Sequence, residues 1–135
     1  MSSKVNIAVI GAGWWCTDFH LPYLSSLENV NLLSVCRFGQ TELNLVKNKF
    51  NFTYASENFE EALSYEELHG AIISTPHTSH YVCAKEALNN KLHVIIEKPM
   101  TTSAKEAQDL FVLSKKNQKQ IIIPYGYNFT HFMDK

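Results

Sequence analysis

The chain has 135 residues, of which 45% are hydrophobic and 19% are charged, and its formal net charge is −1. This balance predicts one globular domain that is large enough to fold without disulfide or metal staples, and it provides no basic field for nucleic acid. The three cysteines are widely spaced and show no disulfide or metal-binding pattern, and we find no secretory leader and no apolar run of about 18 residues. We therefore predict a cytoplasmic protein without a membrane partner.

Apolar runs of strand length alternate with helical patterns along the chain. In chain order we expect strand 5–10, helix 14–27, strand 31–37, helix 41–50, an extended piece at 52–55, helix 56–63, a short helical segment at 65–68, strand 71–74, helix 75–89, strand 92–96, helix 103–117 and strand 120–124. Thr41 and Ser56 are expected N-caps, Ser103 and Glu106 form a capping box, and Pro22 should bend the first helix or begin a second turn of it. This alternation predicts a doubly wound α/β fold with a parallel sheet, in which ligands lie at the carboxyl ends of the strands.

A glycine turn follows the first strand in the stretch KVNIAVIGAGWWC. Gly11 and Gly13 give backbone freedom where a Cβ would clash, so that main-chain N–H groups and the positive end of the next helix can face an anion such as a pyrophosphate. Cys16 stands where the fuller GxGxxG signature has its third glycine, and this small side chain can still allow close packing of helix against strand. A plain strand-to-helix turn is the alternative interpretation.

Arg37 lies near the end of the second strand, about 20 residues after the glycines, where an acidic residue would accept hydrogen bonds from the ribose 2′-hydroxyl of NAD(H). A guanidinium can instead pair with a 2′-phosphate and stack on the adenine. We therefore predict NADP(H), with NAD(H) as the alternative cofactor; a solvated arginine without a ligand is the remaining interpretation. The two tryptophans after the turn are candidate cofactor contacts, because such rings could line the cofactor cleft or fill the space between helix and sheet. Of the two, we expect Trp14 to point toward the site and Trp15 to pack.

The loop after the third strong strand is expected at the same edge of the sheet. Ser74 and Thr75 could contact the nicotinamide ribose through hydroxyl and backbone groups. His77 and His80 lie three residues apart on the following helix and face similar directions. Two histidines without a third ligand predict no metal site, and His80 is better explained as a residue that packs and caps near the edge of the cofactor.

The tripeptide Glu97-Lys98-Pro99 ends the next apolar strand. Lys98 could hold its ammonium against a substrate hydroxyl, Glu97 could orient it or pair with it, and Pro99 fixes the exit of the chain. A surface ion pair would explain an isolated tripeptide of this kind. Because three features fall on one edge of the sheet, we interpret them as a single site.

The segments GAGWWCTDFHLPYL, STPHTSHYVCAKEAL and KLHVIIEKPMTTSAKEAQDL together resemble the N-terminal half of the Gfo/Idh/MocA oxidoreductase family over residues 5–128. The resemblance implies a Rossmann fold in which Lys98 is the catalytic residue that contacts the reacting hydroxyl or carbonyl. It also implies that Glu97, the loop from Ser74 to His80, which includes His77, and Asn128 in the crossover to a second domain contact the cofactor.

The chain departs from the family pattern at three places. Cys16 replaces a glycine or alanine, and Arg37 replaces the usual acidic residue, which favours NADP(H). Phe129 and Thr130 stand where the family has an arginine, so no role is transferred to them. Family members continue into a second α/β domain that supplies an Asp and a His of the substrate site.

We therefore expect residues 1–124 to form a dinucleotide-binding domain and residues 125–135 to begin the crossover into a substrate domain that this chain lacks. The expected function is that of the NADP(H)-binding domain of an oxidoreductase that transfers hydride between the nicotinamide and a sugar, cyclitol or related polyol. The fragment alone should be inactive. A non-catalytic nucleotide-binding or sensing module is the alternative, an α/β domain that binds no nucleotide is a third, and the oligomeric state stays open.

Overall fold

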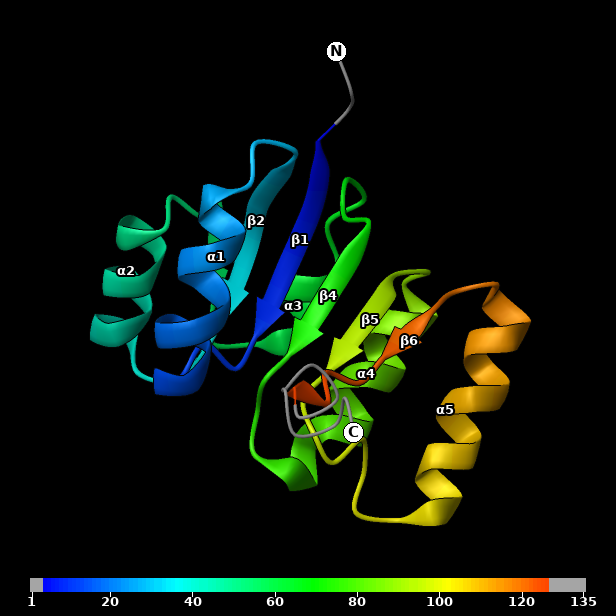
Figure 1. Ribbon diagram of the computed structural model, residues 1–135. Coiled ribbons are helices and arrows are strands. Elements are labelled where there is room, and N and C mark those ends of the chain that lie inside the picture. Colours follow the sequence, from blue (N-terminus) through cyan, green and yellow to red (C-terminus); the bar gives the residue numbers. More distant parts are fainter. Residues whose placement is uncertain (1–3, 127–135) are drawn as a thin grey trace, which may run out of the picture.

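The computed structural model describes residues 4–126 and contains a six-stranded parallel sheet with helices on both faces (Figure 1). The strands pair in the order β3-β2-β1-β4-β5-β6, which is the strand order of the doubly wound dinucleotide-binding fold and confirms the predicted fold class. The strands are β1 (Val5–Ile10), β2 (Val30–Cys36), β3 (Tyr54–Ser56), β4 (Gly70–Ile73), β5 (His93–Ile96) and β6 (Ile121–Ile122). Each of them overlaps a strand or extended piece predicted from the sequence.

The helices cover the sheet in two layers (Figure 1). They are the π-helical turn η1 (Cys16–His20), α1 (Leu21–Ser26), α2 (Gln40–Lys49), α3 (Phe59–Leu63), the 3₁₀ turn η2 (His77–Ser79), α4 (His80–Asn89) and α5 (Ala104–Asn117). The first three pack against one face through a cluster that includes Leu21 and Val35. Helices α3, α4 and α5 pack against the opposite face, so the central strands are buried on both sides and their apolar runs are nearly continuous.

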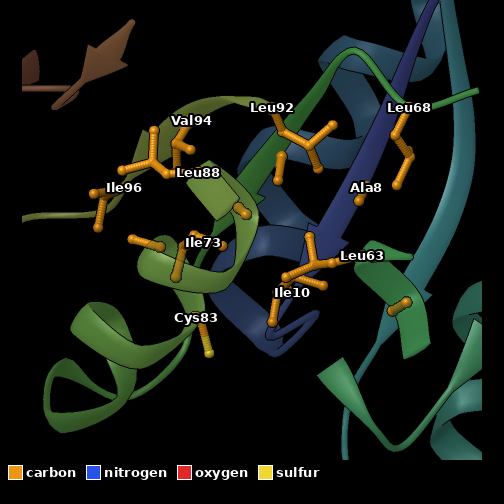
Figure 2. Close-up of a cluster of buried hydrophobic side chains, with 14 of the residues drawn as sticks. Ala8, Ile10, Leu63, Leu68, Ile73, Cys83, Leu88, Leu92, Val94 and Ile96 are labelled. Atoms are coloured by element: carbon orange, nitrogen blue, oxygen red, sulfur yellow. The ribbon is translucent and has the colours of Figure 1, made fainter. Parts of the chain in front are cut away.

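Figure 2 shows the core on the second face. Ile10, Ile73 and Ile96 come from β1, β4 and β5, and they meet Leu63 of α3 and Leu88 of α4. All five side chains are at most 1% exposed. Full burial of an aliphatic side chain of this size is worth about 1.5–3 kcal/mol, so this cluster fixes the three strands whose ends carry the candidate site.

Two predicted helix caps are wrong. Helix α2 begins after Gly39, which has a φ of +90° and no side-chain cap, and Thr41 lies inside the helix. Helix α3 is capped by Asn58, whose Oδ1 accepts a hydrogen bond of 3.1 Å from Glu61 N–H. Ser56 instead ends β3, and its hydroxyl donates to Glu61 Oε2 at 2.6 Å.

The first helix widens into a π turn. In η1 the N–H of Leu21 donates to the carbonyl of Cys16, five residues back, where an α-helix would use the carbonyl four residues back. Pro22 follows directly and lies in the first turn of α1. Its ring has no N–H and would clash with the carbonyl four residues earlier in a regular helix, and the widened turn relieves that clash.

Of the remaining local predictions, one helix cap is confirmed and one short helix is wrong. Ser103 caps α5 as predicted, because its hydroxyl accepts a hydrogen bond of 3.5 Å from Glu106 N–H. Residues 65–68 form a turn rather than a helix.

None of the helices within residues 4–126 has both the length and the apolar character needed to cross a bilayer. Asn128 and the rest of the predicted crossover after Gly126 lie outside the described residues.

Candidate functional site

The loops that leave β1, β2, β4 and β5 meet at one edge of the sheet, beyond the arrowheads in Figure 1. Three backbone hydrogen bonds continue the sheet ladder into these loops: Gly11 N–H to Cys36 O (2.8 Å), Ser74 N–H to Ile10 O (2.8 Å) and Glu97 N–H to Ile73 O (2.9 Å). The glycine turn, the Ser74 loop and the Glu97-Lys98 loop therefore lie on a common rim, as the sequence predicted.

Two neighbouring cavities lie along this rim. The first, of about 430 Å³, is lined by the glycine turn and by residues after β2, β3 and β4. The second, of about 370 Å³, is lined by Trp14, Trp15, Ser74, Thr75, His77, Glu97 and Lys98. Ser74 and Thr75 line both cavities and form the wall between them. A ligand of two linked parts would suit this arrangement.

The two glycines of the turn have different roles. Gly11 has a φ of +89°, and a Cβ at this position would lie 2.6 Å from the backbone nitrogen of Thr75. The prediction that a Cβ would clash at Gly13 is wrong, because a Cβ there would meet no protein atom within 4 Å. Gly13 lines the first cavity, so its open side leaves room for a ligand. Cys16 is fully buried in the helix-sheet core, as expected for a small residue that replaces the third glycine.

The amides of the turn are mostly used within the protein. Gly11 N–H and Ala12 N–H both donate to Cys36 O, at 2.8 and 3.2 Å, and Gly13 N–H donates to Gly11 O at 2.8 Å. The N–H groups of residues 14–16 donate to no backbone carbonyl of the described chain. The amides of this first helical turn, rather than those of the glycines, are therefore the donors available to an anion.

Arg37 folds across the glycine turn. Its Nη1 donates to Ala12 O at 3.2 Å and its Nε to Phe38 O at 3.3 Å, so the guanidinium is half-buried at the wall of the first cavity rather than free in solvent. Glu57, which sequence reasoning missed, lines the same cavity and accepts a hydrogen bond of 2.6 Å from Gly39 N–H. It follows β3, so the argument that found Arg37 at the end of β2 could have found it.

Glu97 is held by three donors at the wall of the second cavity. Its Oε1 accepts from Trp15 Nε1 at 3.0 Å and contacts His20 Nε2 at 2.6 Å, while its Oε2 accepts from Lys98 N–H at 3.3 Å. Burial by itself would raise the pKa of Glu97, but the hydrogen bonds from His20 and Trp15 outweigh it and lower the pKa below the ordinary 4.5. The carboxylate is therefore ionised at neutral pH. Sequence reasoning did not single out His20.

The two tryptophans both face the second cavity. Trp14 is 70% exposed and points outward, as expected. The prediction that Trp15 packs between helix and sheet is wrong: it is 40% exposed, lines the cavity and binds Glu97 through its indole N–H. The rings of Trp14 and Trp15 lie 5.6 Å apart between centroids in an edge-on arrangement, which gives the cavity a partly aromatic wall.

Lys98 and His77 lie at the second cavity, whereas His80 does not. Lys98 is exposed, and its ammonium forms no ion pair with the described residues. His80 is 0% exposed; its Nδ1 lies 2.7 Å from Pro99 O and its Nε2 lies 2.9 Å from Thr75 O. Both ring nitrogens are thus used inside the protein, as expected for a histidine that packs and caps at this edge, and a contact of His80 with the cofactor stays a prediction. His80 joins the loop after β4 to the loop after β5.

Comparison with known proteins places the chain among oxidoreductases. It is 28% identical to an uncharacterized oxidoreductase, sll0816, from Synechocystis sp. over 95% of this chain and 34% of the relative. It is 27% identical to glucose-6-phosphate 3-dehydrogenase from Bacillus subtilis over 96% of this chain and 36% of that enzyme. The chain therefore spans about a third of the length of the curated relatives that it matches.

The fold is also that of a solved oxidoreductase. A crystal structure of a 3-ketoreductase from Actinomadura kijaniata, in complex with TDP-benzene and NADP, superimposes with a TM-score of 0.89 at 17% identity over 98% of this chain and 42% of that one. The family described as "Oxidoreductase family, NAD-binding Rossmann fold" matches residues 5–125. This chain thus belongs to the Gfo/Idh/MocA oxidoreductase family.

Proposed function

We propose that the chain is the NADP(H)-binding domain of an oxidoreductase that acts on a sugar, cyclitol or related polyol. The observation that carries the choice of cofactor is the Arg37 guanidinium at the wall of the first cavity, beside the glycine turn. A guanidinium there offers paired N–H donors to a ribose 2′-phosphate. The polyol class is supported by the relative that is named a glucose-6-phosphate 3-dehydrogenase.

The residues present fit a dinucleotide. The open side of Gly13 and the amides of residues 14–16 would hold the pyrophosphate, because both lie where the first helix begins. Arg37 would hold the 2′-phosphate in the first cavity. Across the Ser74–Thr75 wall, the second cavity would take the nicotinamide and its ribose against Trp14, Trp15, His77, Glu97 and Lys98. Asn128 remains a predicted cofactor contact.

Lys98 is the proposed catalytic residue. When it is bound, the nicotinamide supplies the group that accepts or gives the hydride. Lys98 would hydrogen-bond the oxygen of the reacting carbon, polarise it and move its proton. Because Lys98 is exposed in the cavity and unpaired among the described residues, its ammonium is available to that oxygen. This arrangement favours an enzyme over a sensing module.

Cofactor binding is tested by titrating the 135-residue chain with NADPH and NADH. We expect NADPH to bind more tightly than NADH. Arg37→Ala should weaken the affinity for NADPH by about 10- to 100-fold and have little effect on the affinity for NADH, since it removes a charge-assisted pair. Lys4→Ala, at the opposite edge of the sheet, is the matched loss of one charge and should change neither dissociation constant. Equal NADPH affinity in the wild type and Arg37→Ala would contradict the choice of NADP(H).

Glu57 supplies the complementary variant, because its carboxylate is the acidic group that lines the first cavity. A carboxylate can accept from a ribose 2′-hydroxyl and repels a 2′-phosphate. We therefore expect Glu57→Gln to strengthen NADPH relative to NADH. If Glu57→Gln abolishes NADH binding and Arg37→Ala changes the affinity for neither cofactor, the protein binds NAD(H) rather than NADP(H).

Turnover is the test of Lys98. We propose that the complete protein, rather than residues 1–135 alone, reduces NADP⁺ with a polyol, because this chain covers only about a third of its relatives. In that protein Lys98→Ala should lower kcat by about 10²- to 10⁴-fold and leave NADPH affinity within about threefold. Lys105→Ala, on α5, is the control. Unchanged kcat in Lys98→Ala would remove this lysine from the mechanism.

A further inference from the structure

We propose that His20 is a positioning residue, which fixes the Glu97 carboxylate so that its second oxygen can accept a hydrogen bond from a ribose hydroxyl in the nicotinamide half of a dinucleotide. The inference rests on the proposed function, because it names a residue outside the cavity lining that prepares the second cavity for its ligand. It is carried by the contact of 2.6 Å between His20 Nε2 and Glu97 Oε1.

The direction of this hydrogen bond follows from the carboxylate. An ionised carboxylate can only accept, so Nε2 of His20 carries the proton and donates it. Trp15 Nε1 donates to the same Oε1 at 3.0 Å. Two donors from one helical segment thus hold one oxygen, and a charge-assisted bond is stronger than a neutral one.

The π turn explains why two residues five apart reach the same atom. In a regular α-helix, residues five apart point about 140° away from each other, so Trp15 and His20 would face different directions. In η1 the hydrogen bond runs from Leu21 back to Cys16, and the wider turn brings residues five apart toward the same side. Pro22 maintains this widening because it excludes the regular alternative. The helix geometry and the Glu97 contact therefore belong together.

The second carboxylate oxygen of Glu97 has capacity left for a ligand. Oε1 is committed to Trp15 and His20, whereas Oε2 has only the longer bond of 3.3 Å from Lys98 N–H among the described residues. Glu97 lines the second cavity together with Lys98. An ionised oxygen fixed there can accept from a hydroxyl and can serve as a counter-charge to the Lys98 ammonium. Without His20 the carboxylate could rotate, and its free oxygen would lose this fixed direction.

The test compares two replacements of His20. In His20→Gln the side-chain amide nitrogen lies about as far from the backbone as Nε2 of histidine and can still donate to Oε1. In His20→Asn the side chain is shorter, so its amide nitrogen cannot reach Oε1. Each variant of the 135-residue chain is titrated with NADPH and with adenosine 2′,5′-bisphosphate, which carries the 2′-phosphate but no nicotinamide. The proton resonance of the Trp15 indole N–H is followed by NMR and is assigned with Trp14→Phe, because the chain has two tryptophans.

We expect His20→Asn to weaken the affinity for NADPH about tenfold, since one hydrogen bond to a charged group is lost. The affinity for adenosine 2′,5′-bisphosphate should stay unchanged. The Trp15 resonance should move in His20→Asn, and both properties should return toward wild type in His20→Gln. Wild-type behaviour of His20→Asn would overturn the proposal. Equal weakening of both ligands would also overturn it, because it would show a merely structural role for His20.

Failure of the proposed function gives a different result. In that case the wild type binds neither NADPH nor adenosine 2′,5′-bisphosphate. The Trp15 resonance then still decides whether His20 fixes Glu97: a shift in His20→Asn that reverts in His20→Gln supports it, and an unmoved resonance overturns it.

Discussion

Gly11 shows how closely one residue can be constrained by its neighbours. Its φ of +89° and the backbone of Thr75, only 2.6 Å from a would-be Cβ, exclude any side chain on two independent grounds. Gly13, two residues later, has neither constraint from the protein. The pair therefore separates a glycine that the fold requires from one whose open side is useful only if a ligand lies against it.

We expect Gly11→Ala to lower the free energy of unfolding by more than about 2 kcal/mol, because of backbone strain and steric overlap. Gly13→Ala should stay within about 1 kcal/mol of the wild type and should instead weaken NADPH binding. Urea unfolding and ligand titration of both variants provide the measurement. Similar stabilities for the two variants would show that the turn can shift to accept a Cβ at Gly11.

The sequence revealed those site residues that follow directly from strand ends. Gly11, Arg37, Ser74 and Lys98 each come where an apolar run stops, and parallel strands bring such positions together. His20 could not be found in this way, because only the π turn brings it beside Trp15. The misplacement of Trp15 has the same cause, since a regular helix period was assumed for its direction.

At the scale of the elements, the helix starts depend on tertiary contacts that local patterns do not contain. Asn58 rather than Ser56 caps α3, because Ser56 ends β3 and is already engaged with Glu61. Gly39 rather than Thr41 is the residue that precedes α2, and its N–H donates a hydrogen bond to Glu57, 18 residues away. Existence and order of the elements were predictable from periodicity, whereas these boundaries were set by neighbouring strands and loops.

The two caps give a matched stability test. Asn58→Ala should destabilise the protein by about 1 kcal/mol, because it removes the acceptor of Glu61 N–H at the start of α3. Thr41→Ala should be close to neutral, because Thr41 is exposed and makes no cap hydrogen bond. Thermal or urea unfolding would resolve the difference. A larger cost for Thr41→Ala than for Asn58→Ala would contradict the cap assignment.

At the scale of the whole molecule, Glu97 links the site to acid stability. Its pKa in the folded protein lies below the ordinary 4.5, because the bonds from His20 and Trp15 outweigh burial, which acts in the opposite direction. A carboxyl group with a lowered pKa stabilises the fold above its unfolded pKa, and this contribution is lost as the pH falls through the folded value.

The wild type and Glu97→Gln should therefore differ most in free energy of unfolding above pH 4.5, with the wild type more stable. The difference should shrink as the pH falls below the folded pKa, where Glu97 is also uncharged. Urea unfolding across this pH range provides the measurement. A difference that stays constant, or that grows toward acid, would show that Glu97 ionisation is not linked to folding.

The hydrogen bonds that carry the sheet ladder past the strand ends have a consequence for binding. Gly11, Ser74 and Glu97 are each anchored through their N–H to a neighbouring strand, so the loops share the rigidity of the sheet. The conformational entropy of these segments is lost when the chain folds, and a ligand would meet a preorganised surface. Association should then be fast, with little rearrangement of the backbone between the free and bound forms.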